Sequence, residues 1–155
     1  MSGDSHDALV SEIADAYEGV EGATLPILHK VQEALGYIPD SALPIVAEAL
    51  NISRAEIYGV VTFYHDFRRE PPGRHVVKLC RAEACQAMGG REVAAHLKKR
   101  LGVDFGETSP DGRVTLEAVY CLGLCATAPS AMVDGRLVGR IDREKADAIT
   151  LEIQR

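Results

Sequence analysis

The sequence predicts an α/β fold, in which a short N-terminal helical bundle precedes a small mixed sheet covered by helices. Three observations predict it. Apolar residues recur at helical spacing in the first part of the chain. The segment REPPGR, residues 69–74, then stops any helix, and strand-like and helix-like segments alternate after it. With 155 residues, 46% apolar and 26% charged, the chain is typical of a folded protein with one domain of ordinary size and a smaller attachment.

Four short helices are expected in the first part: residues 7–18, Thr24 to Gly36, Asp40 or Ser41 to about Leu50, and Ser53 onward. Thr24 is a candidate N-cap of the second helix, and Gly36 is its candidate end. Ser53, followed three residues later by Glu56, matches the capping-box pattern of a helix N-terminus. The first part is therefore predicted to be all helical.

The adjacent prolines and glycine at residues 71–73 predict a boundary between a helical segment, residues 1–68, and a second domain, residues 73–155. The elements expected in the second domain are a strand at 75–80, a helix at 90–101, a strand at 113–120, a hairpin of 130–133 and 136–139, and a helix at 142–153. Asp134 and Gly135 are typical residues of the hairpin turn. This order is compatible with a thioredoxin-like layout.

Charge is divided unevenly along the chain. Residues 1–50 contain nine acidic side chains and one basic one, a net charge of -8, whereas residues 51–155 contain fourteen acidic and sixteen basic side chains, a net charge of +2. The basic residues of the second part are mixed with acidic ones, and no aromatic residues alternate with them. We therefore expect no nucleic-acid partner.

No membrane span is expected, because the longest stretch without a formal charge, residues 118–133, is shorter than the ~18 residues that a membrane helix needs. The acidic N-terminus lacks the basic and apolar regions of a secretory signal, which favours a cytoplasmic protein. In the cytoplasm, four persistent thiols are more often metal ligands or redox groups than structural disulfides.

The four cysteines of the chain form two pairs in the second domain. Cys80 and Cys85 have four residues between them, and Cys121 and Cys125 have three. Each pair comes at the end of a predicted strand, so neighbouring strands would bring both pairs to the same edge of the sheet. A 2Fe-2S cluster takes four thiolates, two on each iron. The spacing therefore favours one such cluster, held by these four cysteines.

Two alternatives stay open at this point. A structural zinc site also uses four thiolates, although its pairs are usually of the C-x2-C type. A thiol-disulfide oxidoreductase normally has a C-x-x-C motif, which this chain lacks.

Nearly the whole chain resembles the 24 kDa-type 2Fe-2S subunit of respiratory complex I and its relatives in NAD-linked hydrogenases and formate dehydrogenases. The resemblance is carried by LPILHKVQEALGYIPDSAL at residues 25–43, AEIYGVVTFYHDFRREPPGRHVVKLC at residues 55–80 and DGRVTLEAVYCLGLCATAPSAMVDGRLVGRI at residues 111–141. It implies a helical N-terminal part and a thioredoxin-like ferredoxin domain with one 2Fe-2S cluster on the four cysteines.

Within this family, CRAEACQAMGG at residues 80–90 looks most like the gamma subunit of soluble, molybdenum-containing, NAD-dependent formate dehydrogenase. Complex I relatives more often have small or threonine residues where Arg81, Glu83 and Gln86 stand here. The alternative parent complexes are complex I and NAD-linked hydrogenases. A further alternative is an independent ferredoxin that carries electrons between separate proteins.

The resemblance implies a flavin- and NAD-binding partner subunit, and a larger molybdenum or iron-sulfur catalytic subunit in the same complex. This chain itself has no G-x-G-x-x-G after a strand and no Walker pattern, so we expect it to be non-catalytic alone. The acidic helical segment is expected to dock the subunit onto its partner.

Several other residues are given structural roles. Tyr58, Phe63 and Tyr64 are expected in the core, because they occur at helical spacing. The histidines at positions 29, 65, 75 and 96 are expected to be surface or hydrogen-bonded structural residues without a carboxylate partner. A trans bond is expected between Ala128 and Pro129.

Overall fold

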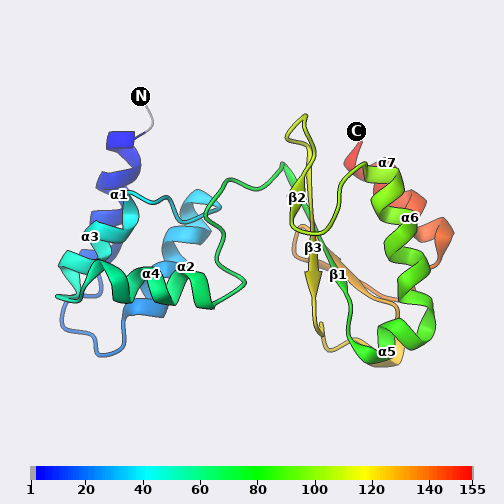
Figure 1. Ribbon diagram of the computed structural model, residues 1–155, viewed down its shortest axis with the longest axis horizontal. Helices are drawn as coiled ribbons and strands as arrows, with labels where there is room; N and C mark the ends of the chain where they lie inside the picture. Colours follow the sequence, from blue (N-terminus) through cyan, green and yellow to red (C-terminus); the bar gives the residue numbers. More distant parts are fainter. Residues whose placement is uncertain (1–2, 155) are drawn as a thin grey trace. The chain divides into compact units, whose positions relative to one another are not determined.

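The computed structural model describes residues 3–154 and divides the chain into two compact units, one up to Pro71 and one from Pro72. The first unit is helical and the second contains a sheet with helices (Figure 1). Each unit has its own buried apolar cluster, so the two are described separately.

The first unit consists of four helices: α1 Gly3–Asp15, α2 Thr24–Leu35, α3 Ala42–Ala49 and α4 Arg54–Phe63. The helix α1 begins earlier than expected, because its polar first turn does not show in an apolar pattern. The expected N-cap of α2 is wrong, because buried Ala23 already has helical φ and ψ and Thr24 lies inside the helix. The capping box of α4 is confirmed, with Glu56 N–H donating to Ser53 Oγ at 3.2 Å and Ser53 N–H donating to the Glu56 carboxylate at 2.8 Å.

The three aromatic side chains expected in the core are exposed instead, with exposed fractions of 46% for Tyr58, 71% for Phe63 and 43% for Tyr64. The buried residues of α4 are Ile57 and Val61, which lie four positions apart on one face. Tyr58 and Phe63 lie off this face, and Tyr64 follows the last helical residue. Helical spacing alone does not show which face of α4 is buried.

The second unit contains a five-stranded sheet in the order β2-β3-β1-β4-β5. The central strand β1, His75–Cys80, pairs in parallel with β3, Val114–Val119, and antiparallel with β4, Ala131–Val133. The hairpin partner of β4 is β5, Arg136–Val138. The sheet also contains β2, Glu107–Thr108, which the sequence does not predict because two residues cannot show an alternating pattern.

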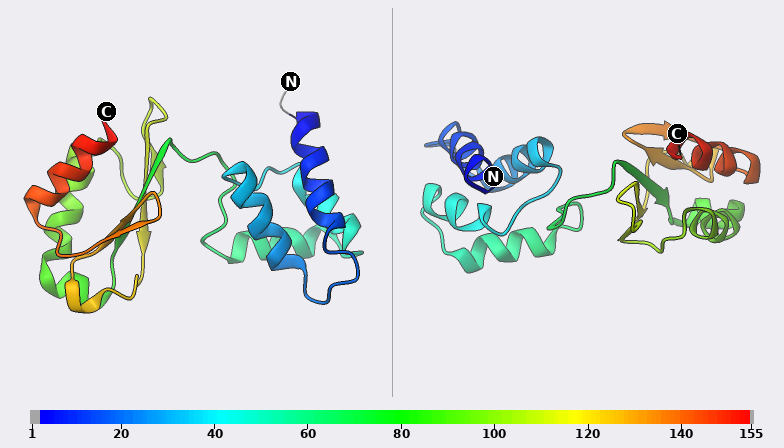
Figure 2. Two further views of the ribbon diagram at one scale, coloured as in Figure 1. Left: turned by 180° about the vertical axis from the view of Figure 1, so that it is seen from behind. Right: turned by 90° about the horizontal axis from the view of Figure 1, so that it is seen from above.

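Two helices, α6 Arg91–Leu101 and α7 Arg143–Ile153, cover one face of this sheet (Figures 1 and 2). Side chains from β1, β3 and β4 meet side chains from both helices in one core. The largest fully buried members are Leu79, Leu97, Leu116, Ile141 and Ile153. This arrangement confirms the predicted fold class, a helical segment followed by a thioredoxin-like domain.

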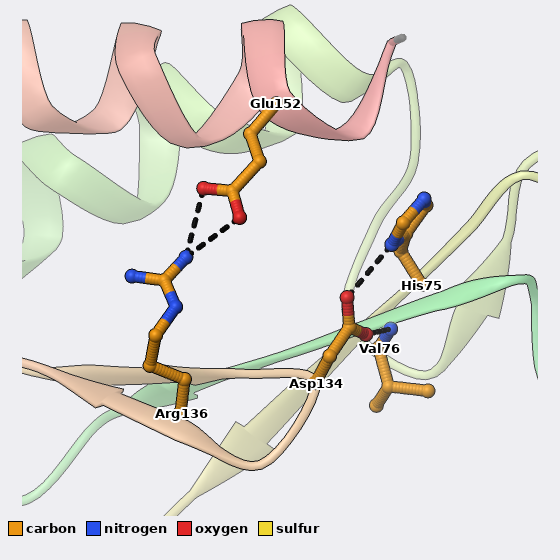
Figure 3. Close-up of polar contacts among 5 residues, drawn as sticks. All are labelled: His75, Val76, Asp134, Arg136 and Glu152. Carbon is orange, nitrogen blue, oxygen red and sulfur yellow. Dashed lines mark hydrogen bonds and ion pairs between the residues drawn. The ribbon is translucent and has the colours of Figure 1, made fainter.

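The turn of the β4–β5 hairpin is tied to β1 by Asp134 (Figure 3). One carboxylate oxygen of Asp134 accepts from Val76 N–H at 2.8 Å, and the other lies 2.7 Å from His75 Nδ1. On the same hairpin, the Arg136 guanidinium contacts both carboxylate oxygens of Glu152 in α7 at 2.8 Å. The hairpin is thereby fixed to the central strand and to the helical layer.

Among residues 3–154, no helix is long and apolar enough to cross a membrane.

Candidate functional site

The site begins where the two central parallel strands end side by side. Cys80 is the last residue of β1, and its partner in the register is Val119, the last residue of β3. Arg81 N–H donates to Val119 O at 2.7 Å, which holds the two strand ends together. The expectation that both cysteine pairs follow neighbouring parallel strands is confirmed, because Cys121 comes two residues after Val119.

The first cysteine pair is buried, with 2% of Cys80 and 2% of Cys85 exposed. Cys85 ends a short helical turn, α5 Glu83–Cys85, and a π-type turn at Gln86–Gly90 leads into α6. Cys85 therefore precedes α6, as the expected helix at residues 90–101 implies, but it lies in a short helical turn that the sequence does not predict. A Cβ atom at Gly90 would stand 2.5 Å from Cys85 O, so only glycine allows this close approach.

The second cysteine pair is exposed on the loop after β3. The sulfur atoms of Cys121 and Cys125 are 4.0 Å apart, and Gly123 N–H donates to Cys121 Sγ at 3.3 Å. Cys121 has a φ of 131°, which non-glycine residues rarely adopt. Strained backbone of this kind concentrates at functional sites, and no residue pattern in the sequence predicts it.

Burial and hydrogen bonds shift the pKa values of Cys80, Cys85 and Cys125. Burial raises the pKa of Cys80. Burial also acts to raise the pKa of Cys85, but hydrogen bonds to Ser130 and Cys80 outweigh it and lower that pKa overall. The pKa of exposed Cys125 is raised by the hydrogen bond and charge of Cys121, with smaller contributions from Cys85 and Cys80. Both cysteines of the first pair thus influence a cysteine of the second.

The donor set fits a two-iron cluster better than a single ion. All four cysteines are free. A single zinc ion needs all four ligands to converge on one point at about 2.3 Å, whereas the cysteines here form one buried pair and one exposed pair. Two separate thiol pairs match the two thiolates per iron of a 2Fe-2S cluster.

Ser130 is a member of the site that the sequence analysis missed. It is 1% exposed, and its Oγ lies 3.5 Å from Cys85 Sγ. The preceding bond, Ala128–Pro129, is cis, so the expected trans bond is wrong. In the sequence, the one feature that marks Ser130 is its position directly after Pro129. That position by itself indicates only the start of a strand.

His75 and His96 form hydrogen bonds with carboxylates and not with the cysteines. His75 contacts Asp134, and His96 Nε2 lies 2.9 Å from Asp147 Oδ1 on α7. The expectation that they lack carboxylate partners is wrong for these two residues, because their partners are distant in sequence and adjacent only in the fold. Both contacts tie elements of the second unit together.

A small mixed sheet that brings two pairs of free thiols to one edge defines a class of protein suited to carrying a metal–sulfur group. Residues 10–154 match the model of the thioredoxin-like [2Fe-2S] ferredoxin family. The chain belongs to this family, whose members carry a 2Fe-2S cluster.

Known relatives agree with this membership. The chain is 40% identical over 118 residues to a subunit of the NADH-quinone oxidoreductase of Pseudomonas aeruginosa, covering 76% of this chain and 71% of the relative. It is 34% identical over 132 residues to the HndA subunit of the NADP-reducing hydrogenase of Solidesulfovibrio fructosivorans, covering 85% and 77%.

Among solved structures, it is similar to a chain of an NAD+-reducing [NiFe]-hydrogenase in the air-oxidized state, with a TM-score of 0.72 and 27% identity. The similarity covers 85% of this chain but only 23% of the hydrogenase chain.

Proposed function

We propose that this chain is an electron-transfer subunit in which Cys80, Cys85, Cys121 and Cys125 hold one 2Fe-2S cluster, each pair serving one iron. The observation that carries the proposal is the pairing of free thiols at the adjacent ends of two parallel strands. When bound, the cluster takes up and releases one electron. The chain's own residues bind it, bury one pair of thiolates and donate a backbone N–H to Cys121 Sγ.

Iron and sulfide analysis of the anaerobically purified chain tests this assignment. We expect two irons and two sulfides per chain, and a paramagnetic signal that develops only on one-electron reduction. Zinc in stoichiometric amount without iron or sulfide is the outcome that contradicts it, and zinc thiolates also lack the red-brown colour of the cluster.

The proposed setting is a larger NAD-linked oxidoreductase with a flavin- and NAD-binding partner and a catalytic subunit that contains molybdenum or iron-sulfur centres. The names of the relatives support the NAD link, because they are subunits of an NADH-quinone oxidoreductase and of an NADP-reducing hydrogenase. The particular parent that we propose is NAD-dependent formate dehydrogenase, with this chain as its gamma subunit. That choice rests on the likeness of CRAEACQAMGG at residues 80–90 to this subunit.

Affinity purification of the full chain from its native cells tests the parent complex. Co-purification of a molybdenum subunit together with formate-dependent NAD reduction is expected. Recovery of membrane quinone-reductase subunits, or of nickel-containing subunits, assigns the chain to complex I or to a hydrogenase instead. Recovery of the holoprotein alone favours an independent ferredoxin.

We further propose that residues 1–68 dock the subunit onto the flavin-bearing partner, whereas residues 73–155 hold the cluster. The first 50 residues carry a net charge of -8, which suits steering toward a basic surface. Beside α4, a groove of about 490 Å³ is lined by Ile52, Val60, Phe63 and Tyr64, among others. Exposed aromatic residues next to a groove are typical anchors of protein interfaces.

The variant Phe63→Ala in the full chain tests the docking role. We expect about a thirtyfold or greater loss of affinity for the partner subunit, since an interface anchor contributes ~2 kcal/mol or more, with unchanged cluster content. Leu151→Ala removes a comparably exposed apolar side chain, 55% exposed, from the second unit and serves as the matched control. Equal affinity of both variants and the parent chain would show that α4 merely belongs to a structural cap.

A further inference from the structure

Arg81 is held in a fixed position beside the first cysteine pair. It follows Cys80 directly, and its N–H donates to Val119 O at 2.7 Å. Gln86 Nε2 donates to Arg81 O at 2.9 Å, and Arg91 Nε donates in turn to Gln86 Oε1 at 2.8 Å. The backbone of Arg81 is therefore fixed on both sides, by the end of β3 and by the turn that contains Cys85.

The side chain of Arg81 is half-buried and lacks a counter-ion among the described residues. Its Nε is buried without a hydrogen-bond partner in the described part of the chain. Its guanidinium carbon lies 4.9 Å from the ring centre of Phe105, and Lys98 Nζ lies 4.4 Å from the same centre. Lys98 also pairs with Asp104, whereas none of the ion pairs among residues 3–154 includes Arg81. Burying part of a charged group without an opposite charge is costly, so the position needs an explanation.

The missing negative charge belongs to the cysteine site itself. Two ferric ions, two sulfides and four thiolates give an oxidised 2Fe-2S cluster a net negative charge, and one added electron makes it more negative by one unit. Arg81 directly follows the Cys80 ligand, and the Cα atoms of consecutive residues are about 3.8 Å apart. Its side-chain charge is therefore separated from Cys80 by ~10 Å or less, a distance similar to one Debye length. No residue from 118 to 133 carries a formal charge. Two acids are nearby: Glu83 is exposed and thus screened by water, and Asp104, which precedes Phe105, is paired with Lys98.

We propose that Arg81 is a half-buried counter-charge of the cluster and a positioning residue for electron transfer, because its fixed positive charge favours the reduced form and raises the reduction potential. This inference rests on the proposed function. No bond forms or breaks in the step: one electron enters the cluster, and the charge of Arg81 stays constant. The guanidinium is held against the ring face of Phe105 by a cation–π contact.

Redox titration of the full-length holoprotein, followed by visible absorption and by the paramagnetic signal, tests the proposal. Arg81→Gln should shift the midpoint potential to more negative values, and Arg81→Lys should keep most of the parent value because it keeps the charge. Most of the difference between the parent protein and Arg81→Gln should persist at high salt, since salt screens a partly buried charge less than an exposed one. Lys99→Gln removes an exposed cation of α6 and should leave the potential unchanged.

Phe105→Leu provides a second route to the same answer if Arg81→Gln does not load its cluster. It keeps both charges but removes the ring that holds Arg81, and it should lower the potential by a smaller amount. An unchanged potential in a fully loaded Arg81→Gln or Phe105→Leu protein overturns the inference, and so does a salt-sensitive shift or equal shifts in the Gln and Lys variants. A parent chain without iron and sulfide overturns the proposed function instead, so the two failures are distinguishable.

Discussion

The two cysteine pairs differ in how the fold holds them. Cys80 and Cys85 are 2% exposed and lie against the end of β1, the turn before α6 and the buried hydroxyl of Ser130. Cys121 and Cys125 are exposed on the loop after β3, where Gly123 N–H donates to Cys121 Sγ and Arg140 N–H donates to Thr127 O. The difference indicates a division of labour, in which the first pair anchors the site in the core and the second presents it to solvent or to a partner.

The largest effect is expected from removing any single thiol. Each of the four cysteines changed singly to Ala should abolish a stable cluster, because one iron then loses half of its protein ligands. Iron, sulfide and visible absorbance per chain measure the loss. Cys121→Ser should be milder, because an alkoxide can substitute for a thiolate. A fully loaded Ala variant at any position shows that this thiol is not a ligand.

Thiol labelling of the cluster-free chain separates the two pairs most directly. The second pair should react at once. Cys80 and Cys85 should react at least about a hundredfold more slowly, since a buried thiol reacts only after local opening that costs ~3 kcal/mol. Peptide mapping after timed alkylation measures both rates. Equal rates for all four thiols would falsify the view that the first pair is anchored in a packed core.

Much of this arrangement can be predicted from the sequence. The two central strands are recognisable because short segments rich in Val and Leu end in Cys80 and near Cys121, and their parallel pairing follows from the helix between them. The turn of Glu83–Gly90 cannot be predicted, because it depends on the contact of Gly90 with Cys85 O. The exposure of Phe63 cannot be predicted from periodicity either. Apolar spacing indicates that a helix has an apolar face, but it does not show which residues of that helix are buried.

A pair of glycine variants compares the two halves of the site at the level of the backbone. Gly90→Ala should lower the free energy of unfolding by about 3 kcal/mol, because the new Cβ would stand 2.5 Å from Cys85 O and 2.9 Å from Cys85 C. Gly123→Ala should cost about 1 kcal/mol, because its φ of 75° is unfavourable for alanine although the space around it is open. Urea unfolding of the cluster-free chains measures both values. Equal costs would mean that the turn at Gly90 shifts freely.

The smallest effect is expected from the helical layer that covers the core. The hydrogen bond to His96, with help from the charge of Arg100, lowers the pKa of Asp147 below its usual range. A carboxyl group with a lowered pKa in the folded state adds stability above its ordinary pKa, and this stability is lost as the pH falls through the lowered value. Asp147→Asn should therefore unfold slightly more easily near neutral pH and show a flatter dependence of unfolding free energy on acid pH. Glu144→Gln is the control, since it removes a carboxylate from the same helix but leaves the His96 contact intact.

If the comparison of the cysteine pairs is right, Asp147→Asn should slightly speed the labelling of Cys85, which lies in the turn leading into α6, and leave the labelling of Cys121 unchanged. Faster labelling of Cys121 would show instead that the helical layer supports both halves of the site.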